Sequence, residues 1–130
     1  MTDNELIQQA IEASKKAYAP YSNFHVGAAV LTSSGKVFQG CNVENSSYGL
    51  CNCAERTALF SAVAAGEREF KKLFVYVDRE EFTSPCGACR QVMIELAPDM
   101  EVYLVNNKKQ TKKTTSRELM PWAFSAEDLA

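Results

Sequence analysis

The chain has 130 residues, of which 46% are hydrophobic, and its formal net charge at pH 7 is −2. This length suits a single domain over residues 1–130 with a core that needs no disulfides, and the small net charge argues against a broad nucleic-acid-binding surface. No apolar run reaches the ~20 residues of a membrane span, and the acidic, polar start does not have the features of an export or transit signal, so we expect a cytoplasmic protein with reduced thiols.

The first predicted element is a helix over residues 3–18. Thr2 and Glu5 fit a capping box, in which each side chain accepts a hydrogen bond from the other residue's backbone N–H. Apolar residues follow at helical spacing. Pro20 disfavours helical geometry at the residue before it and should therefore end the helix.

A β-hairpin is expected next. Two β-prone runs, residues 24–32 and 37–43, are separated by the turn formers Ser33-Ser34-Gly35-Lys36. Gly27 lies inside the first run and indicates a bulge or a close approach of another backbone.

The second half of the chain alternates helical and strand-like segments. The patterns predict helix 53–65, strand 73–77, helix 86–96, strand 102–105 and a short helix over 116–119. Strand–helix–strand order implies parallel pairing through right-handed crossovers, so we expect a mixed-sheet α/β fold. The remaining C-terminal part is expected to be irregular, and the lysine pairs 71–72, 108–109 and 112–113 to be solvated loop charges.

A split cysteine cluster carries the chemistry of this sequence. The segment Cys53-Ala54-Glu55 is followed later by Pro85-Cys86-Gly87-Ala88-Cys89. Three thiols can hold one zinc ion and leave its fourth position to water, as in catalytic rather than structural zinc sites. Zinc lowers the pKa of bound water to about 7, and Glu55 would accept the proton that the water loses.

Both groups of thiols lie at predicted helix starts, where free N–H groups favour thiolates. Cys86 and Cys89, three residues apart, present their sulfur atoms on one helix face. Three thiolates and a hydroxide leave excess negative charge around the metal, so a nearby cation is expected. Arg56 and Arg90 are the candidates, and we favour Arg56 as the hydrogen-bond donor to the sulfur atoms.

Other interpretations of the cysteines stay open. Cys51 could complete a closed four-cysteine structural site, although its spacing from Cys53 is tighter than usual. The C-x-x-C motif could also be a redox site, although the expected thioredoxin-like context does not precede it. Cys41 and Cys51 are otherwise expected to be small buried side chains, and His25 to be packed or exposed rather than a metal ligand.

The pattern C-x-E…P-C-x-x-C is the signature of zinc-dependent deaminases with cysteine in place of the first histidine. The similarity extends to the longer segments 24–29, 40–45, 51–58 and 84–91 and to the tail 123–129. Over nearly its whole length the chain resembles the small homotetrameric cytidine deaminases.

This resemblance implies a three-layer αβα sandwich around a mixed, mostly five-stranded sheet. It implies one Zn²⁺ per subunit, bound by Cys53, Cys86 and Cys89. The implied reaction is hydrolytic deamination of cytidine and 2′-deoxycytidine to uridine and 2′-deoxyuridine plus ammonia, in pyrimidine salvage. Glu55 would move protons between water, the ring N3 and the departing ammonia.

The resemblance also implies substrate contacts. Asn42 and Glu44 would hydrogen-bond the ribose 3′-hydroxyl, since an amide and a carboxylate can donate to and accept from a hydroxyl group. Phe24 would pack against the base, and the Ala54 backbone N–H would read the base O2.

Tyr48 and Phe124 would reach the pocket of a neighbouring subunit, so that the active site is completed only in the homotetramer. Several of the implied contacts have a plainer interpretation. Phe24 could be strand core, Asn42 and Glu44 could be loop caps, and Phe124 could serve tail packing alone.

Two further functions remain as alternatives. One is a deaminase of aminoglycosyl-cytosine antibiotics, against which the ribose-binding pair Asn42 and Glu44 argues; the other is a zinc-stabilised interaction module without catalysis. Nucleic acid and 5′-phosphorylated substrates are not expected, because no basic groove with interleaved aromatics is evident and Glu44 would repel a phosphate. The expected partner is a small-molecule nucleoside, with no nucleic acid and no membrane.

Overall fold

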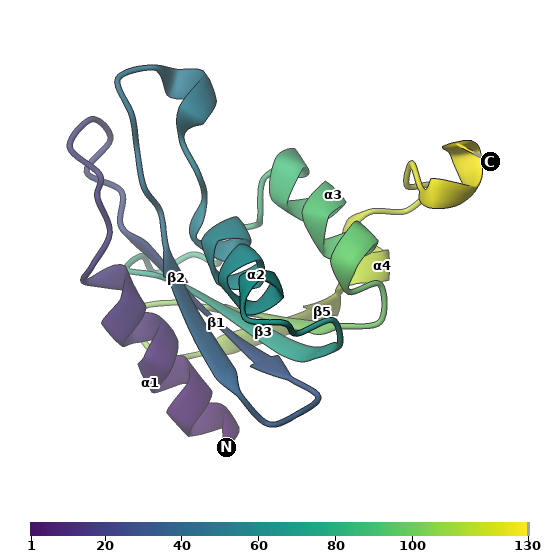
Figure 1. The fold of residues 1–130 in the computed structure, drawn as a ribbon. Helices are drawn as coiled ribbons and strands as arrows, with labels where there is room; N and C mark the ends of the chain where they lie inside the picture. The colour runs from purple at the N-terminus through teal and green to yellow at the C-terminus, as the bar shows by residue number, and fades with distance from the viewer. Residues whose placement is uncertain (130) are drawn as a thin grey trace.

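A computed structural model describes residues 1–129, which form a five-stranded mixed sheet with helices on both faces (Figure 1). Helix α1 covers one face, and α2 and α3 cover the other. The elements are α1 (Asp3–Ser14), β1 (Val26–Thr32), β2 (Val37–Cys41), η1 (Tyr48–Leu50), α2 (Ala54–Ala64), β3 (Phe70–Val77), α3 (Gly87–Leu96), β4 (Glu101–Val105), β5 (Thr111–Thr115), α4 (Ser116–Leu119) and η2 (Ala126–Leu129). This architecture confirms the predicted three-layer αβα sandwich.

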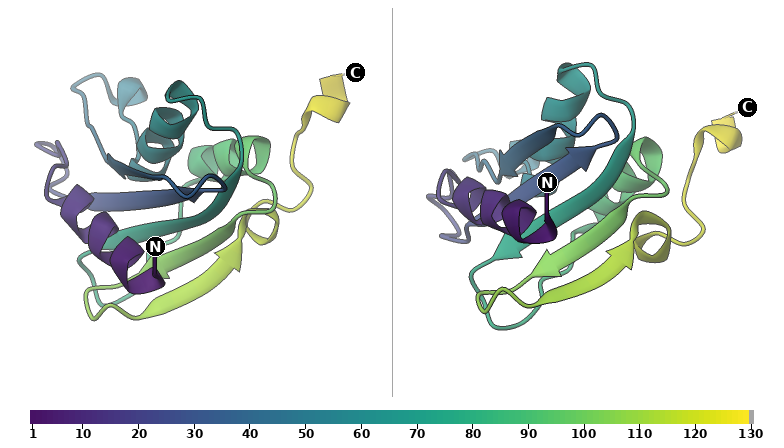
Figure 2. Two further views of the ribbon diagram at one scale, coloured as in Figure 1. Left: turned by 60° about the horizontal axis from the view of Figure 1, so that its bottom comes forward. Right: turned by 90° about the horizontal axis from the view of Figure 1, so that it is seen from below.

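The strands lie in the order β2-β1-β3-β4-β5, which Figure 2 shows from two sides. Strand β1 pairs antiparallel with both β2 and β3, whereas β3 and β4 are parallel and β4 pairs antiparallel with β5. The predicted hairpin and the predicted parallel pair are thus confirmed. The parallel pair follows from the α3 crossover, since parallel neighbours need a long connection that packs on one face of the sheet.

The first helix ends earlier than the sequence predicts, at Ser14 rather than at residue 18. The backbone N–H of Tyr18 donates to the Asn42 carbonyl at 3.0 Å, and the Glu44 N–H donates to the Tyr18 carbonyl at 2.8 Å. This bridge requires extended backbone at Tyr18, so the helix has already ended before the effect of Pro20 is felt.

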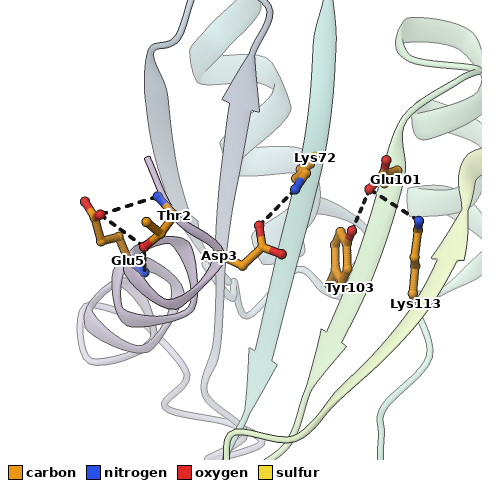
Figure 3. A network of polar contacts seen from close by, with 7 residues as sticks. All are labelled: Thr2, Asp3, Glu5, Lys72, Glu101, Tyr103 and Lys113. Atoms are coloured by element: carbon orange, nitrogen blue, oxygen red, sulfur yellow. Dashed lines mark hydrogen bonds and ion pairs between the residues drawn. The ribbon is translucent and has the colours of Figure 1, made fainter.

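The start of α1 is tied to the sheet by polar contacts (Figure 3). The predicted capping box is present, because Thr2 Oγ1 accepts from the Glu5 N–H at 3.2 Å and the Glu5 carboxylate accepts from the Thr2 N–H at 3.4 Å. Asp3 accepts a hydrogen bond from Lys72 of β3 at 2.9 Å, and Lys72 lies over the ring of Tyr103. Exposed ion pairs of this kind contribute little to stability, so they mainly fix the helix position.

Strand β5 corrects the expectation of an irregular C-terminal part. The lysines 112–113 lie on this strand and 71–72 lie on β3, whereas 108–109 lie in a loop as expected. Strand β5 is an edge strand with mostly exposed side chains, and edge strands often carry lysine, which discourages pairing with other chains. Its sequence therefore has no apolar alternation by which to recognise it.

Two buried apolar clusters fill the space between the sheet and the helices on its two faces. Helix α2 presents a stripe of fully buried small residues, Ala54, Ala58 and Ala62, and so lies close to the sheet. Gly27 plays the matching part on the other face, because a Cβ there would lie 1.9 Å from the Ala10 carbonyl oxygen. This confirms the close backbone approach predicted at Gly27.

Gly40 allows α2 to lie against β2, and its replacement by alanine should destabilise the protein. The new Cβ would lie 2.3 Å from the Ala58 nitrogen and 2.4 Å from the Ala54 carbonyl oxygen. Both contacts are with backbone, so α2 itself must move, and we expect the free energy of unfolding in urea to fall by about 1–3 kcal/mol or more. Gly49→Ala is the control, since nothing lies within 4 Å of a Cβ there; equal losses in the two variants would contradict the prediction.

Candidate metal centre and active site

Three cysteine thiols meet where α2 and α3 begin. Cys53 is the N-cap residue of α2, Cys86 is the N-cap residue of α3, and Cys89 lies in the first turn of α3. The three sulfur atoms lie within 4.8 Å of one another, with 3.7 Å between Cys53 and Cys86 and 3.5 Å between Cys86 and Cys89. The fold thus brings together the two parts of the split cluster.

The geometry of the thiols fits a zinc ion. Zn–S bonds of about 2.3 Å at tetrahedral angles place the sulfur atoms about 3.8 Å apart, close to the separations observed. Within residues 1–129 no other histidine, cysteine, aspartate or glutamate joins the group. The Cys51 sulfur instead accepts from the Asn45 N–H at 3.3 Å, so the alternative four-cysteine site is not formed. Three thiols positioned to bind one metal ion agree with the predicted zinc cofactor, and three is the number of protein ligands typical of catalytic zinc sites.

The pKa values of two of the thiols are shifted in opposite directions. Hydrogen bonding from Cys89 lowers the pKa of Cys53 to about 5, against the effect of burial, and Arg56 lowers it further. The same hydrogen bond and burial raise the pKa of Cys89. These contacts favour the thiolate form of Cys53, the form that binds a metal cation.

Arg56 supplies the positive charge beside the sulfur atoms. Its Nη2 donates to the Cys53 sulfur at 3.4 Å, and this hydrogen bond raises the pKa of Arg56 above its already high value. Its Nε is buried and finds no hydrogen-bond partner within residues 1–129. Arg90, the other candidate, donates to the Pro85 carbonyl and to Ser84 rather than to a sulfur atom. The structure thus contains the hydrogen bond from Arg56 to a cysteine sulfur that the sequence favoured over one from Arg90.

Glu55 is the second residue of α2 and is only 5% exposed. Burial raises its pKa to about 7; the negative charge of Cys53 adds to this effect, and Arg56 opposes it. A carboxyl group with a pKa near neutrality populates both protonation states, so it can accept a proton and return it at neutral pH.

A cavity of about 260 Å³ lies in front of the thiols. Its walls are formed by Ser22, Phe24, Val26, Asn42, Glu44, Cys51, Asn52, Cys53, Ala54, Glu55, Val75, Val77, Thr83, Ser84 and Cys86. All the substrate contacts predicted within one chain are among them. The volume is just below the range of about 300–1,000 Å³ usual for ligand sites, so the cavity suits a small ligand.

The two residues predicted to contact ribose also hold the cavity wall together. Asn42 Oδ1 accepts from the Val26 N–H at 2.9 Å, and its Nδ2 donates to the Phe24 carbonyl at 2.7 Å. The Glu44 carboxylate accepts from the backbone N–H and the hydroxyl of Ser22, and the hydroxyl lowers the pKa of Glu44. The structure therefore contains the loop-cap contacts, which fix both side chains within the cavity wall.

Tyr48 and Phe124 do not line this cavity. Their exposed fractions are 74% and 59%. Tyr48 packs edge-on against Tyr21, with ring centroids 6.1 Å apart. The C-terminal segment that carries Phe124 extends away from the sheet (Figure 1), held by a hydrogen bond of 2.9 Å from Gln91 Nε2 to the Phe124 carbonyl. The predicted roles of both residues in a neighbouring pocket stay predictions.

Several wall residues were not singled out from the sequence. Ser22 holds Glu44, and Thr83 and Ser84 form the wall that precedes Cys86. Ser84 directly precedes the Pro85-Cys86 motif, and this local signal could have identified it from the sequence. The pairing of Ser22 with Glu44 depends on the fold and leaves no trace in the sequence pattern.

Three expectations about other residues need correction or refinement. Cys41 and Cys51 are half-buried rather than buried, because Cys41 ends the edge strand β2 and Cys51 borders the cavity. His25 is exposed, as one of the two expectations had it, but it lies in the loop before β1 rather than on a strand, with Nε2 3.3 Å from Asn23 Oδ1.

Comparisons with known proteins agree with this geometry. Residues 1–105 match the family model described as the cytidine and deoxycytidylate deaminase zinc-binding region. A cytidine deaminase of Sporosarcina psychrophila is 51% identical over 100% of this chain and 96% of its own length, and one of Halalkalibacterium halodurans is 53% identical over 95% of both. The crystal structure of a cytidine deaminase from Burkholderia pseudomallei has a TM-score of 0.92 and 59% identity, over 95% of this chain and 100% of that one.

Proposed function

We propose that this chain, which belongs to the cytidine and deoxycytidylate deaminase family, converts cytidine to uridine and ammonia by zinc-dependent hydrolysis. Family membership makes it an enzyme with a small-molecule substrate. We add 2′-deoxycytidine as a substrate, because the sugar contacts that we assign address the 3′-hydroxyl and leave the 2′ position free. A place in pyrimidine salvage is consistent with this reaction.

One observation carries the proposal. A buried carboxyl group, that of Glu55, lies beside three thiols that fit zinc, at a cavity of about 260 Å³. A zinc-stabilised interaction module would need neither the carboxyl group nor the cavity. Hydrolysis at a metal-activated water needs both, since the proton of the water must be taken up and the substrate must reach the metal.

The chain's own residues supply the proton transfers. Cys53, Cys86 and Cys89 would hold the zinc ion, which lowers the pKa of a water molecule from 15.7 to about 7 when bound. Glu55 would take a proton from the attacking water and deliver it to N3 of the cytosine ring, while the water oxygen would form a bond to C4. Glu55 then carries the second proton to the amino group, the C4–N bond breaks and ammonia leaves. Arg56 offsets the negative charge of the thiolates throughout.

The cavity walls orient the nucleoside. We assign Phe24 to the face of the base and the Ala54 N–H to the base O2, because both border the cavity. An amide nitrogen can donate two hydrogen bonds and a carboxylate can accept several. Asn42 and Glu44 can therefore hydrogen-bond the 3′-hydroxyl in addition to their contacts with the cavity wall. The negative charge of Glu44, which Ser22 holds in place, would repel a 5′-phosphate and so disfavour binding of nucleotides.

The open side of the cavity suggests assembly. Tyr48 and Phe124 are exposed aromatic residues that do not line the cavity beside the thiols of their own chain, and we propose that they complete the pockets of neighbouring subunits in a homotetramer. None of the helices within residues 1–129 is long and apolar enough to cross a membrane. We assign the whole chain to one catalytic domain and place it in the cytoplasm.

Replacing Phe124 by alanine should raise the KM for cytidine about tenfold or more, because a buried aromatic side chain contributes roughly 1.5–3 kcal/mol. Steady-state kinetics test this, with Leu129→Ala, another exposed apolar residue of the tail, as the control. In mixed oligomers of Phe124→Ala and Glu55→Gln subunits part of the parental KM should return, since a Glu55→Gln subunit supplies Phe124 to a neighbouring pocket that keeps Glu55. A parental KM in Phe124→Ala would contradict the assignment.

Ammonia release tests the proposed function as a whole. Zinc-loaded protein is incubated with cytidine, 2′-deoxycytidine, their 5′-phosphates, a cytosine nucleoside antibiotic and short single-stranded DNA. We expect release from the two nucleosides and little from the others. No release from either nucleoside, with one zinc per chain shown to be bound, would leave the interaction module as the better hypothesis.

A further inference from the structure

Arg90 connects three segments around the metal site. It follows Cys89 on α3, and its Nε donates to the Pro85 carbonyl at 2.8 Å, its Nη2 to the Ser84 hydroxyl at 2.5 Å, and its Nη1 to the Leu119 carbonyl at 3.1 Å. All three nitrogen atoms of the guanidinium group are therefore used, each on a different acceptor.

Two of these acceptors belong to the loop that delivers a zinc ligand. The Pro85 carbonyl is part of the peptide bond that enters Cys86, and Ser84 lines the cavity. Groups that hydrogen-bond a metal ligand orient it, and their loss commonly costs 10–100-fold in metal affinity; Arg90 acts one step further out, on the peptide group that precedes Cys86.

The third acceptor lies at the root of the C-terminal tail. Leu119 is the last residue of α4, and the chain then leaves the body with Trp122 in the left-handed region at φ 56°. Gln91, the residue after Arg90, holds the same tail further along through the Phe124 carbonyl at 2.9 Å. Adjacent residues of α3 thus fix both the departure of the tail and its aromatic residue.

The chemistry of these contacts calls for arginine. Within residues 1–129 Arg90 forms no ion pair with a carboxylate, so its role is not charge pairing. A planar fork with five N–H donors can reach three acceptors in fixed directions, whereas lysine has a single nitrogen at its end. Arg90 is also half-buried, so loss of the side chain would leave its acceptors poorly satisfied.

We propose that Arg90 is a positioning residue that couples the zinc-ligand loop to the C-terminal tail. Order at the metal site supports order in the tail, and the reverse, through the carbonyl groups of Pro85 and Leu119. The inference rests on the proposed function in one respect, because the catalytic value of an ordered tail depends on the role assigned to Phe124. The coupling itself can be measured without turnover.

Trp122 is the only tryptophan in the sequence and lies in the tail, where it is fully exposed, so its fluorescence anisotropy reports on tail mobility. In the zinc-loaded parent protein, removal of zinc by a chelator should lower this anisotropy. In Arg90→Gln the anisotropy should already be low and should not respond to the chelator, and zinc affinity by chelator competition should fall on the order of tenfold. Arg90→Lys should show the same loss of coupling in a variant that keeps the charge.

Arg117→Gln is the matched control, because Arg117 lies on α4 and pairs only with the exposed Asp99 at 2.9 Å. It should behave as the parent does. A parallel cycle on kcat/KM should give less than multiplicative losses for Arg90→Gln combined with Phe124→Ala, since both act through the tail. Equal anisotropy responses to zinc removal in the parent and in both Arg90 variants would overturn the coupling, whether or not cytidine is deaminated.

Discussion

Replacement of Glu55 by glutamine should lower kcat/KM for cytidine by about 10²–10⁴-fold, the range that general acid–base catalysis contributes. Glutamine has nearly the same size as glutamate and fits the site, where the Glu55 side chain is only 5% exposed. It cannot accept the proton of water or return it to the ring. Because burial disfavours the charged carboxylate, its removal should not lower the free energy of unfolding at pH 7.

The measurements are steady-state kinetics, zinc content and urea unfolding on the same preparations. Glu12→Gln is the control, since Glu12 is exposed on α1, on the other face of the sheet. Full activity in zinc-loaded Glu55→Gln would remove Glu55 from the mechanism. Loss of zinc together with activity would instead assign Glu55 to the integrity of the metal site.

The chemistry of the site is concentrated in one helical turn, and for that reason the sequence reveals it. Cys53, Ala54, Glu55 and Arg56 run from the N-cap of α2 into its first turn. Residues three apart on a helix are neighbours, so Arg56 returns to Cys53 without any help from the rest of the fold. Cys86 and Cys89 repeat this relation on α3. Ligand, base and cation were therefore readable as local spacing.

Features that depend on pairing between distant segments were not readable in the same way. Strand β5 exists because β4 offers it an edge, and the exposed residues of Thr111–Thr115 carry no apolar alternation. The end of α1 is set by the bridge from Tyr18 to Asn42. The double role of Asn42, which caps the wall and borders the cavity, also needs the fold before it can be recognised.

Replacement of Cys86 by serine should strongly weaken zinc binding, and with it the deamination of cytidine. Cys86 is exposed, so the change leaves the core intact. Its sulfur accepts from the Cys89 N–H at 3.5 Å as the cap of α3, and serine is a good N-cap residue. Structural zinc sites gain roughly 10–16 kcal/mol from their ligands together, so loss of one thiolate should weaken binding by at least about 10²-fold.

Thermal unfolding separates this loss of a ligand from damage to the fold. A ligand that binds only the folded state stabilises it, so a chelator should lower the Tm of the parent protein by more than it lowers that of Cys86→Ser. Cys51→Ser is the matched control, because Cys51 borders the same cavity but contacts the Asn45 backbone rather than the cluster. It should keep one zinc per chain and respond to the chelator as the parent does. Cys86→Ser protein that retains one tightly bound zinc would show that the metal does not depend on Cys86, and the three-thiol site would have to be redrawn with another ligand.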